Sequence, residues 1–211
     1  LGSQVVETQT HEAVAFAAEN GIILVHDSAY AEMAYDGSRP PSALNAKGAM
    51  DLAIEFGSLS KYFNMTGWRI GWAVGNPDVV GTLTTLKSNI DSGAFQAVQA
   101  AATAAMNGPW DSVDSMREVY RRRRDKVVGT LKELGCDIES PKGSIYVWAP
   151  VPAAYTSASF AEHVFDRTGV VITPGNGYGA HGEGYFRISL TVADGDLDEA
   201  LGRFKAEGLR F

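Results

Sequence analysis

Cysteine is almost absent from this sequence, which contains Cys136 alone among its 211 residues. A single cysteine excludes an internal disulfide and a metal site built from several cysteines. No stretch approaches the ~20 uninterrupted apolar residues that a membrane-spanning helix needs. The first ten residues, LGSQVVETQT, also lack the basic start and apolar core of a secretory signal. We therefore expect a cytoplasmic protein that is not associated with a membrane.

Basic residues are also fewer than acidic ones, with 18 Lys and Arg residues against 25 Asp and Glu residues. The formal net charge is therefore -7. A general affinity for nucleic acid is therefore not expected. The basic run at 121–124, RRRR, lies in a segment whose apolar residues recur at helical spacing. We interpret these arginines as largely the solvated side of a long helix, the alternative being a phosphate-binding patch. The four histidines show no ligand spacing, so no metal site is expected.

Short apolar runs and amphipathic segments alternate along the first part of the chain. This alternation is typical of an α/β fold, because a short apolar run bounded by turn residues predicts a buried strand. Strands are expected at 22–27, 52–58 and 68–75, and helices at 10–19, 76–90 and 95–106. Asn20-Gly21 predicts the end of the first helix, and Asn76-Pro77 the start of the second.

After the long helix, strands and helices mix differently, as in a smaller α+β lobe. Strands are expected at 144–150, 170–173 and 185–191, with helices at 157–169 and 194–208. Gly177 to Gly182 matches G-x-G-x-x-G, but that dinucleotide fingerprint requires a following helix, and here a strand follows. We interpret this segment as a flexible loop beside a binding cleft.

The segment SLSKYFNMTGWRIGW, 58–72, combines one amine with hydroxyl groups and a guanidinium. A desolvated lysine such as Lys61 forms an imine with an aldehyde. Ser58 and Ser60 offer hydroxyl donors, and Arg69 offers a planar fork that suits phosphate oxygens. An aldehyde that carries a phosphate uses all of these groups, and pyridoxal 5′-phosphate is the common cofactor of that kind.

Two further residues satisfy what the pyridine ring of this cofactor needs. The strand IILVHD ends in Asp27, and a carboxylate at the ring nitrogen keeps it protonated so that the ring accepts electrons. Tyr30, three residues later, offers a phenol to the ring oxygen. Asp27 and Lys61 follow successive strands, at the edge where α/β folds bind ligands. Taken singly, Asp27 is also typical of a strand-end cap and Tyr30 of a packed aromatic.

The segments HDSAY, 26–30, and SLSKYFNMTGWRIG, 58–71, resemble the cofactor-binding signature of fold-type I aminotransferases of classes I and II. In that family the signature has the form S-x-S-K followed by G-x-R-x-G. The resemblance implies that Lys61 is the Schiff-base lysine that also moves the substrate proton. It likewise implies that Asp27 pairs with the pyridinium and that Tyr30 donates to the ring oxygen.

The same resemblance assigns the anion ligands. Ser58 and Arg69 are similar to the family's phosphate ligands, with Ser60 assisting. Arg187, in YFRISL, resembles the arginine that holds the substrate α-carboxylate, an anion that suits a bidentate fork. The reaction implied is transamination between an amino acid and a 2-oxo acid by a homodimer.

Three segments, 87–101, 143–157 and 182–191, resemble LL-diaminopimelate aminotransferases and their relatives, some of which act on alanine, aspartate or other amino acids. Two other functions fit the same motifs. One is a carbon–sulfur lyase or β-elimination on the same cofactor. The other is a non-catalytic, aminotransferase-like domain through which a transcription regulator senses the cofactor.

The resemblance also implies a domain organisation. Residues 1–115 would be the C-terminal part of the large cofactor-binding domain, a mainly parallel sheet with helices on both faces. Residues 116–211 would be the small α+β C-terminal domain. The chain then looks like the C-terminal half of a family member. Because the cofactor would lose much of its enclosure, we expect the 211 residues alone to be inactive or weakly active.

Overall fold

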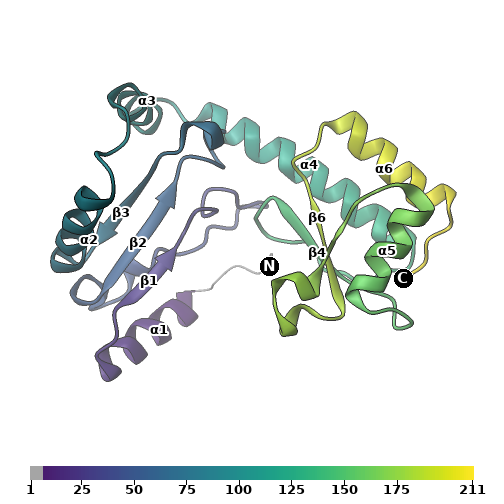
Figure 1. Cartoon of the computed structure of the whole chain (residues 1–211), viewed down its shortest axis with the longest axis horizontal. Coiled ribbons are helices and arrows are strands. Elements are labelled where there is room, and N and C mark those ends of the chain that lie inside the picture. Colours follow the sequence, from purple (N-terminus) through teal and green to yellow (C-terminus); the bar gives the residue numbers. More distant parts are fainter. Residues whose placement is uncertain (1–6) are drawn as a thin grey trace. The chain divides into compact units, whose positions relative to one another are not determined.

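A computed structural model describes residues 7–211, which form two compact units. One unit ends at Arg117, and the other runs from Glu118 to Phe211. A long helix, α4 (Asp111–Glu133), contains the junction between them. Each unit has its own sheet, as Figure 1 shows. Each unit also has its own cluster of buried apolar side chains.

The first unit is built on a three-stranded sheet in the order β1-β2-β3. Its strands are β1 (Leu24–Asp27), β2 (Ala53–Ser58) and β3 (Gly71–Gly75). β1 and β2 are parallel, whereas β2 and β3 are antiparallel. All three strands were expected from the sequence. The third is shorter than predicted because Thr66–Trp68 forms a 3-10 turn.

Three helices accompany this sheet: α1 (Glu7–Asn20), α2 (Pro77–Ile90) and α3 (Gln96–Asn107). The start of α2 follows the sequence prediction. The Asn76 side chain accepts hydrogen bonds from the amides of Asp78 and Val79, with proline at the first helical position. Beneath β1 in Figure 1, α1 contributes Val14 to a small apolar cluster that also includes leucines and alanines of the β1–β2 connection.

One buried carboxylate links the sheet to the connection between β1 and β2. Glu55 of β2 is buried, and its Oε2 accepts hydrogen bonds from Ser42 Oγ at 2.5 Å and from the amide of Ala43 at 3.1 Å. His26 Nδ1 lies 3.0 Å from the same oxygen, and His26 is the neighbour of Glu55 in the parallel register. The carboxylate therefore ties β1, β2 and the connecting segment together.

The second unit contains an antiparallel sheet in the order β4-β6-β5. Its strands are β4 (Tyr146–Pro150), β5 (Thr173–Pro174) and β6 (Tyr185–Ser189). The alternation of side chains along β4 buries Val147 and Ala149 and leaves the other face half-buried. The strand expected at 170–173 is only two residues long, because a 3-10 turn follows it directly.

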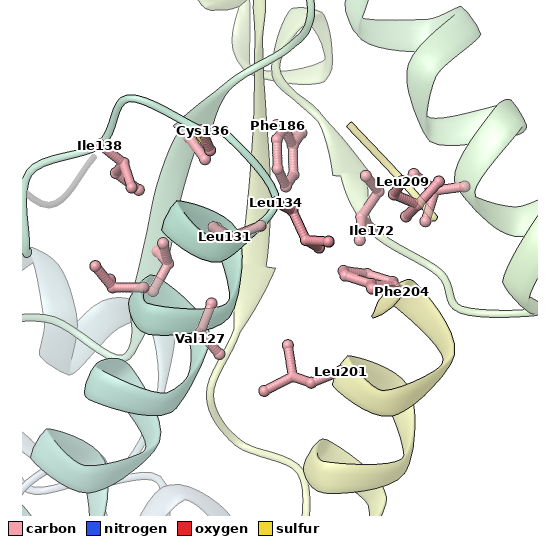
Figure 2. Close-up of a cluster of buried hydrophobic side chains, with 14 of the residues drawn as sticks. Val127, Leu131, Leu134, Cys136, Ile138, Ile172, Phe186, Leu201, Phe204 and Leu209 are labelled. Atoms are coloured by element: carbon pink, nitrogen blue, oxygen red, sulfur yellow. The ribbon is translucent and has the colours of Figure 1, made fainter. Parts of the chain in front are cut away.

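Two helices, α5 (Ser157–Thr168) and α6 (Asp194–Ala206), pack on this sheet with the second half of α4. A capping box between Thr156 and Ser159 starts α5, and Gly169 ends it with a positive φ of 68°. Figure 2 shows the core of the unit, where side chains of α4 face those of α6 beside β6. The labelled side chains are Val127, Leu131, Leu134, Cys136, Ile138, Ile172, Phe186, Leu201, Phe204 and Leu209.

The glycine-rich segment before β6 is more ordered than a flexible loop. It forms two 3-10 turns, Gly175–Tyr178 and Ala180–Gly182. A Cβ atom added at Gly175 would lie 2.1 Å from the carbonyl oxygen of Gly182, so the two backbones meet as only glycine permits. The segment leads into β6, as predicted, and not into the helix that a dinucleotide site requires.

Of the four arginines at 121–124, Arg121, Arg123 and Arg124 form ion pairs, which argues against a phosphate-binding patch. Arg121 contacts Glu118 and Asp125, and Arg123 contacts Asp194. Arg124 departs from the expected solvated face, because it is 3% exposed and donates to the carbonyl oxygen of Pro141 at 2.9 Å. Within residues 7–211, no helix is long and apolar enough to cross a membrane, and no cluster of metal-binding side chains is found.

We predict that Glu55→Ala lowers the free energy of unfolding by about 1–3 kcal/mol, because Ser42 and the Ala43 amide lose their buried acceptor. Urea unfolding followed by circular dichroism measures this change. Glu12→Ala, on the exposed surface of α1, is the control and should stay within about 0.5 kcal/mol. Equal effects of the two substitutions would contradict the role assigned to Glu55.

We predict that Cys136 does not react with thiol reagents in the folded protein. The side chain is 4% exposed, and burial raises the pKa of its thiol to about 11. Since the thiolate is the reactive form, almost none is present at pH 8. Absorbance after addition of a disulfide reagent should rise only when urea is added. Rapid labelling in buffer alone would show that this core opens readily.

Candidate active site

The C-terminal ends of β1 and β2 bring Asp27 close to the residues that follow β2. In the parallel register Asp27 lies opposite Phe56, and the amide of Ser28 donates to the carbonyl oxygen of Phe56 at 2.8 Å. β2 ends two residues later, at Ser58. Because α/β folds bind their ligands outside the carboxyl ends of strands, this edge of the sheet is the candidate active site.

The side chain of Asp27 projects from the more exposed face of β1. Along this strand the side chains alternate, with Val25 and Asp27 exposed and Leu24 and His26 partly buried. Among residues 7–211, the carboxylate of Asp27 makes no ion pair and no hydrogen bond. It is therefore available to a cationic group of a ligand.

Lys61 and Tyr30 come together from different segments. Lys61 lies in the turn after β2, and Tyr30 lies in the turn after β1. The Nζ of Lys61 is 5.7 Å from the centroid of the Tyr30 ring, within the range of a cation–π contact. Both side chains are partly buried, so the amine stands at the boundary between protein and solvent.

The two serines and the arginine of the motif also form a cluster. Ser58 Oγ accepts a hydrogen bond from the Ser60 amide at 3.2 Å, and Ser60 is buried. Arg69 Nη1 reaches Ser60 Oγ at 3.5 Å and the carbonyl oxygen of Thr66 at 3.0 Å. In turn, Thr66 Oγ1 donates to the carbonyl oxygen of Ser60 at 2.8 Å. These contacts hold the guanidinium beside the hydroxyl groups.

Arg69 has an uncommon backbone conformation. Its φ of 52° lies in the left-handed region, which costs a residue with a Cβ some free energy. The neighbouring strand is crowded too, since a Cβ atom added at Gly71 would lie 2.6 Å from the carbonyl oxygen of Gly57. Arg69 therefore occupies a backbone position that the surrounding contacts impose.

These groups fit the cofactor that the sequence predicted. In the part of the chain that the structure describes, the Nε and Nη2 atoms of Arg69 make no hydrogen bond, so two donors remain for an anion. Hydroxyl groups and a guanidinium suit a phosphate, and the unpaired carboxylate of Asp27 suits a protonated pyridine nitrogen. The primary amine of Lys61 suits an aldehyde.

Arg187 belongs to the other compact unit, where it occupies the middle of β6 opposite Trp148 of β4. Its guanidinium carbon lies 4.1 Å from the centroid of the Tyr146 ring and 4.8 Å from that of Tyr178. Within residues 7–211, its Nε atom is buried and has no hydrogen-bond partner. The structure thus groups the other six predicted site residues in the first unit and places Arg187 among aromatic rings in the second.

One contact near the candidate site was not foreseen from the sequence. Arg117 of α4 donates to the carbonyl oxygen of Glu32 at 2.6 Å through Nε, and its Nη2 lies 2.5 Å from the Glu32 carboxylate. Because Glu32 is only two residues after Tyr30, this ion pair fixes the segment that carries the phenol. Its partners are 85 positions apart, and no local pattern signals such a pair.

The aromatic neighbours of Arg187 had a partial signal in the sequence. Alternation along 144–150 places Tyr146 and Trp148 on the same face of a strand, and Tyr178 lies in the glycine-rich segment. The sequence predicted only that the segment containing Tyr178 lies beside a binding cleft. It did not predict that two rings would contact the guanidinium of Arg187.

Known proteins resemble this chain in sequence and in fold. The family model described as "Aminotransferase class I and II" matches residues 1–204. An LL-diaminopimelate aminotransferase of Desulforudis audaxviator is 57% identical over 192 residues, which cover 91% of this chain and 49% of that protein. The crystal structure of an aromatic aminotransferase from Pyrococcus horikoshii OT3 matches with a TM-score of 0.91 and 31% identity, covering 97% of this chain and 56% of that one.

A second structural match is the L,L-diaminopimelate aminotransferase of Chlamydomonas reinhardtii. Its TM-score is 0.87 at 31% identity, with 97% of this chain and 52% of that chain covered. The present chain therefore spans about half the length of the relatives that it matches.

Proposed function

Because this chain belongs to the aminotransferase class I and II family, we propose that its protein transfers an amino group from an amino acid to a 2-oxo acid with pyridoxal 5′-phosphate. The observation that carries this proposal is the cluster at the ends of β1 and β2. There the amine of Lys61 lies beside Tyr30, and Arg69 lies beside Ser60.

Each residue of the first unit takes a distinct part in this proposal. Arg69, Ser58 and Ser60 bind the phosphate through charge-assisted and hydroxyl hydrogen bonds. The carboxylate of Asp27 keeps the ring nitrogen protonated, and Tyr30 donates its phenol hydrogen to the ring oxygen. When bound, the cofactor supplies an electrophilic aldehyde carbon and a ring that withdraws electrons.

Lys61 carries the proton transfer in this proposal. Its Nζ is the only amine among the proposed site residues, so it serves as the covalent attachment point and as the base that takes the substrate α-proton. The Tyr30 ring, whose centroid is 5.7 Å from Nζ, restricts the positions that the amine can adopt.

For the substrate, we propose the diaminopimelate branch of the family. Relatives named LL-diaminopimelate aminotransferase are 57% and 55% identical to this chain over 91% and 92% of its length. Arg187 holds the α-carboxylate of the amino acid, a role that suits its partly buried guanidinium, which makes no hydrogen bond to the described residues.

We also propose a homodimer in the cytoplasm. The end of α2 and the connection to α3 present large apolar side chains to solvent, with Ile90 72% and Phe95 75% exposed. Exposed apolar residues of this size favour association with another protein surface. A location in the cytoplasm agrees with amino-acid metabolism and with the single, buried cysteine.

We predict that Lys61→Ala abolishes covalent attachment of pyridoxal phosphate. The chain is incubated with the cofactor and treated with borohydride, and its peptides are analysed by mass spectrometry. The label should be found on the peptide with Lys61, because this amine is held beside Tyr30. Lys47→Ala, at an exposed lysine of the same unit, should leave the labelling unchanged. Labelling spread evenly over the lysines would refute the assignment.

We predict that Arg69→Asn weakens binding of pyridoxal phosphate by about tenfold to hundredfold, as expected for loss of charge-assisted hydrogen bonds. Asparagine is chosen because it tolerates the left-handed backbone of this position. Binding of pyridoxal, which lacks the phosphate, should change little. Arg39→Asn, at an exposed arginine of the same unit, is the control. An equal loss for both ligands in Arg69→Asn would show that Arg69 does not bind the phosphate.

A further inference from the structure

The charge of Arg187 is surrounded in an unusual way. Among residues 7–211, the guanidinium has no carboxylate partner and no hydrogen bond, and the Nε atom is buried. Buried charges are normally paired, because an unpaired charge in a low dielectric is costly. The contacts that offset this cost are the rings of Tyr146 at 4.1 Å and Tyr178 at 4.8 Å.

The two tyrosines are themselves held in place. Tyr146 belongs to β4, whose ladder with β6 also contains Arg187. The Tyr178 ring packs edge-on against Trp148 at 5.7 Å, and Trp148 stacks on Tyr185 at 5.6 Å. Together these contacts form one row of aromatic rings beside β6.

The backbone before β6 restrains Tyr178 further. Tyr178 ends the first of two 3-10 turns, and the close approach of Gly175 to Gly182 joins the start of this segment to its end. The Tyr178 side chain is nevertheless 44% exposed. It is therefore a fixed ring that lies at the surface, where a ligand reaches it.

We propose that Tyr146 and Tyr178 are positioning residues that hold the guanidinium of Arg187 ready for a substrate carboxylate. A free arginine side chain loses rotamer freedom when it binds an anion, and that loss weakens binding. Rings that attract the cation restrict it in advance and form no hydrogen bond with it. The N–H donors of Arg187 remain available for a bidentate contact with a carboxylate.

This inference rests on the carboxylate-binding role proposed for Arg187, and it specifies which residues make that role effective. Tyr178 acts through its ring and not through its hydroxyl. Phenylalanine at position 178 should therefore preserve the function, whereas leucine, of similar bulk but without a π face, should not.

The test is a titration of the ¹⁵N-labelled chain with acetate, followed by NMR at the Arg187 Nε–H signal, which Arg187→Gln identifies. In the unsubstituted chain the signal should be displaced by the ring currents of the tyrosines and should move as acetate binds. Tyr178→Leu should need about threefold to tenfold more acetate, as expected for loss of one cation–π contact. Tyr178→Phe should behave like the original protein.

Tyr185→Leu is the matched control, because it removes a ring of the same row that does not contact the guanidinium. If Tyr178→Leu and Tyr185→Leu weaken acetate binding equally, the positioning role of Tyr178 is overturned, while the carboxylate-binding role of Arg187 stands. If acetate never moves the Arg187 signal, Arg187 does not bind a carboxylate, and the positioning role of the tyrosines is refuted as well. An Arg187 signal at the position of an unfolded chain, before any substitution, also overturns the proposal.

Discussion

The parallel register between β1 and β2 is the constraint on which the candidate active site depends. It places Asp27 opposite Phe56. The Asp27 carboxylate and the turn that contains Lys61 therefore lie at the same edge of one sheet. A shift of one residue would turn Asp27 to the other face, because side chains alternate along a strand. Behind this edge, Glu55 accepts hydrogen bonds from the connecting segment and contacts His26, which fixes the register.

Much of this arrangement was predictable from the sequence, because its signals are local. Apolar runs ending in Asp27 and Ser58 marked the two strands, and Asn76-Pro77 marked the start of α2. The motif around Lys61 is specific, because few functions need an amine, hydroxyl groups and a guanidinium within twelve residues. Local patterns of this kind identified the strands, the cofactor and the family.

The remaining features depend on contacts between distant residues, which no local pattern encodes. A glutamate in an apolar strand, such as Glu55, signals that a partner exists but does not identify Ser42. The pair of Arg117 with Glu32 spans 85 positions. The buried position of Arg124 was missed because helical periodicity shows which face is apolar, but not which loop carbonyl lies above a charged side chain.

A comparison of two arginines separates structural from functional charge in this chain. Arg124 is buried, yet it is fully engaged with a backbone carbonyl and with Asp125. In the described part of the chain, the Arg187 guanidinium contacts two aromatic rings, and its buried Nε has no acceptor. The carboxylate of Asp27 is likewise unpaired among residues 7–211, and Arg69 has a strained backbone. A sequence selected for stability alone would satisfy such groups, so their concentration at the proposed site residues is what a binding function requires.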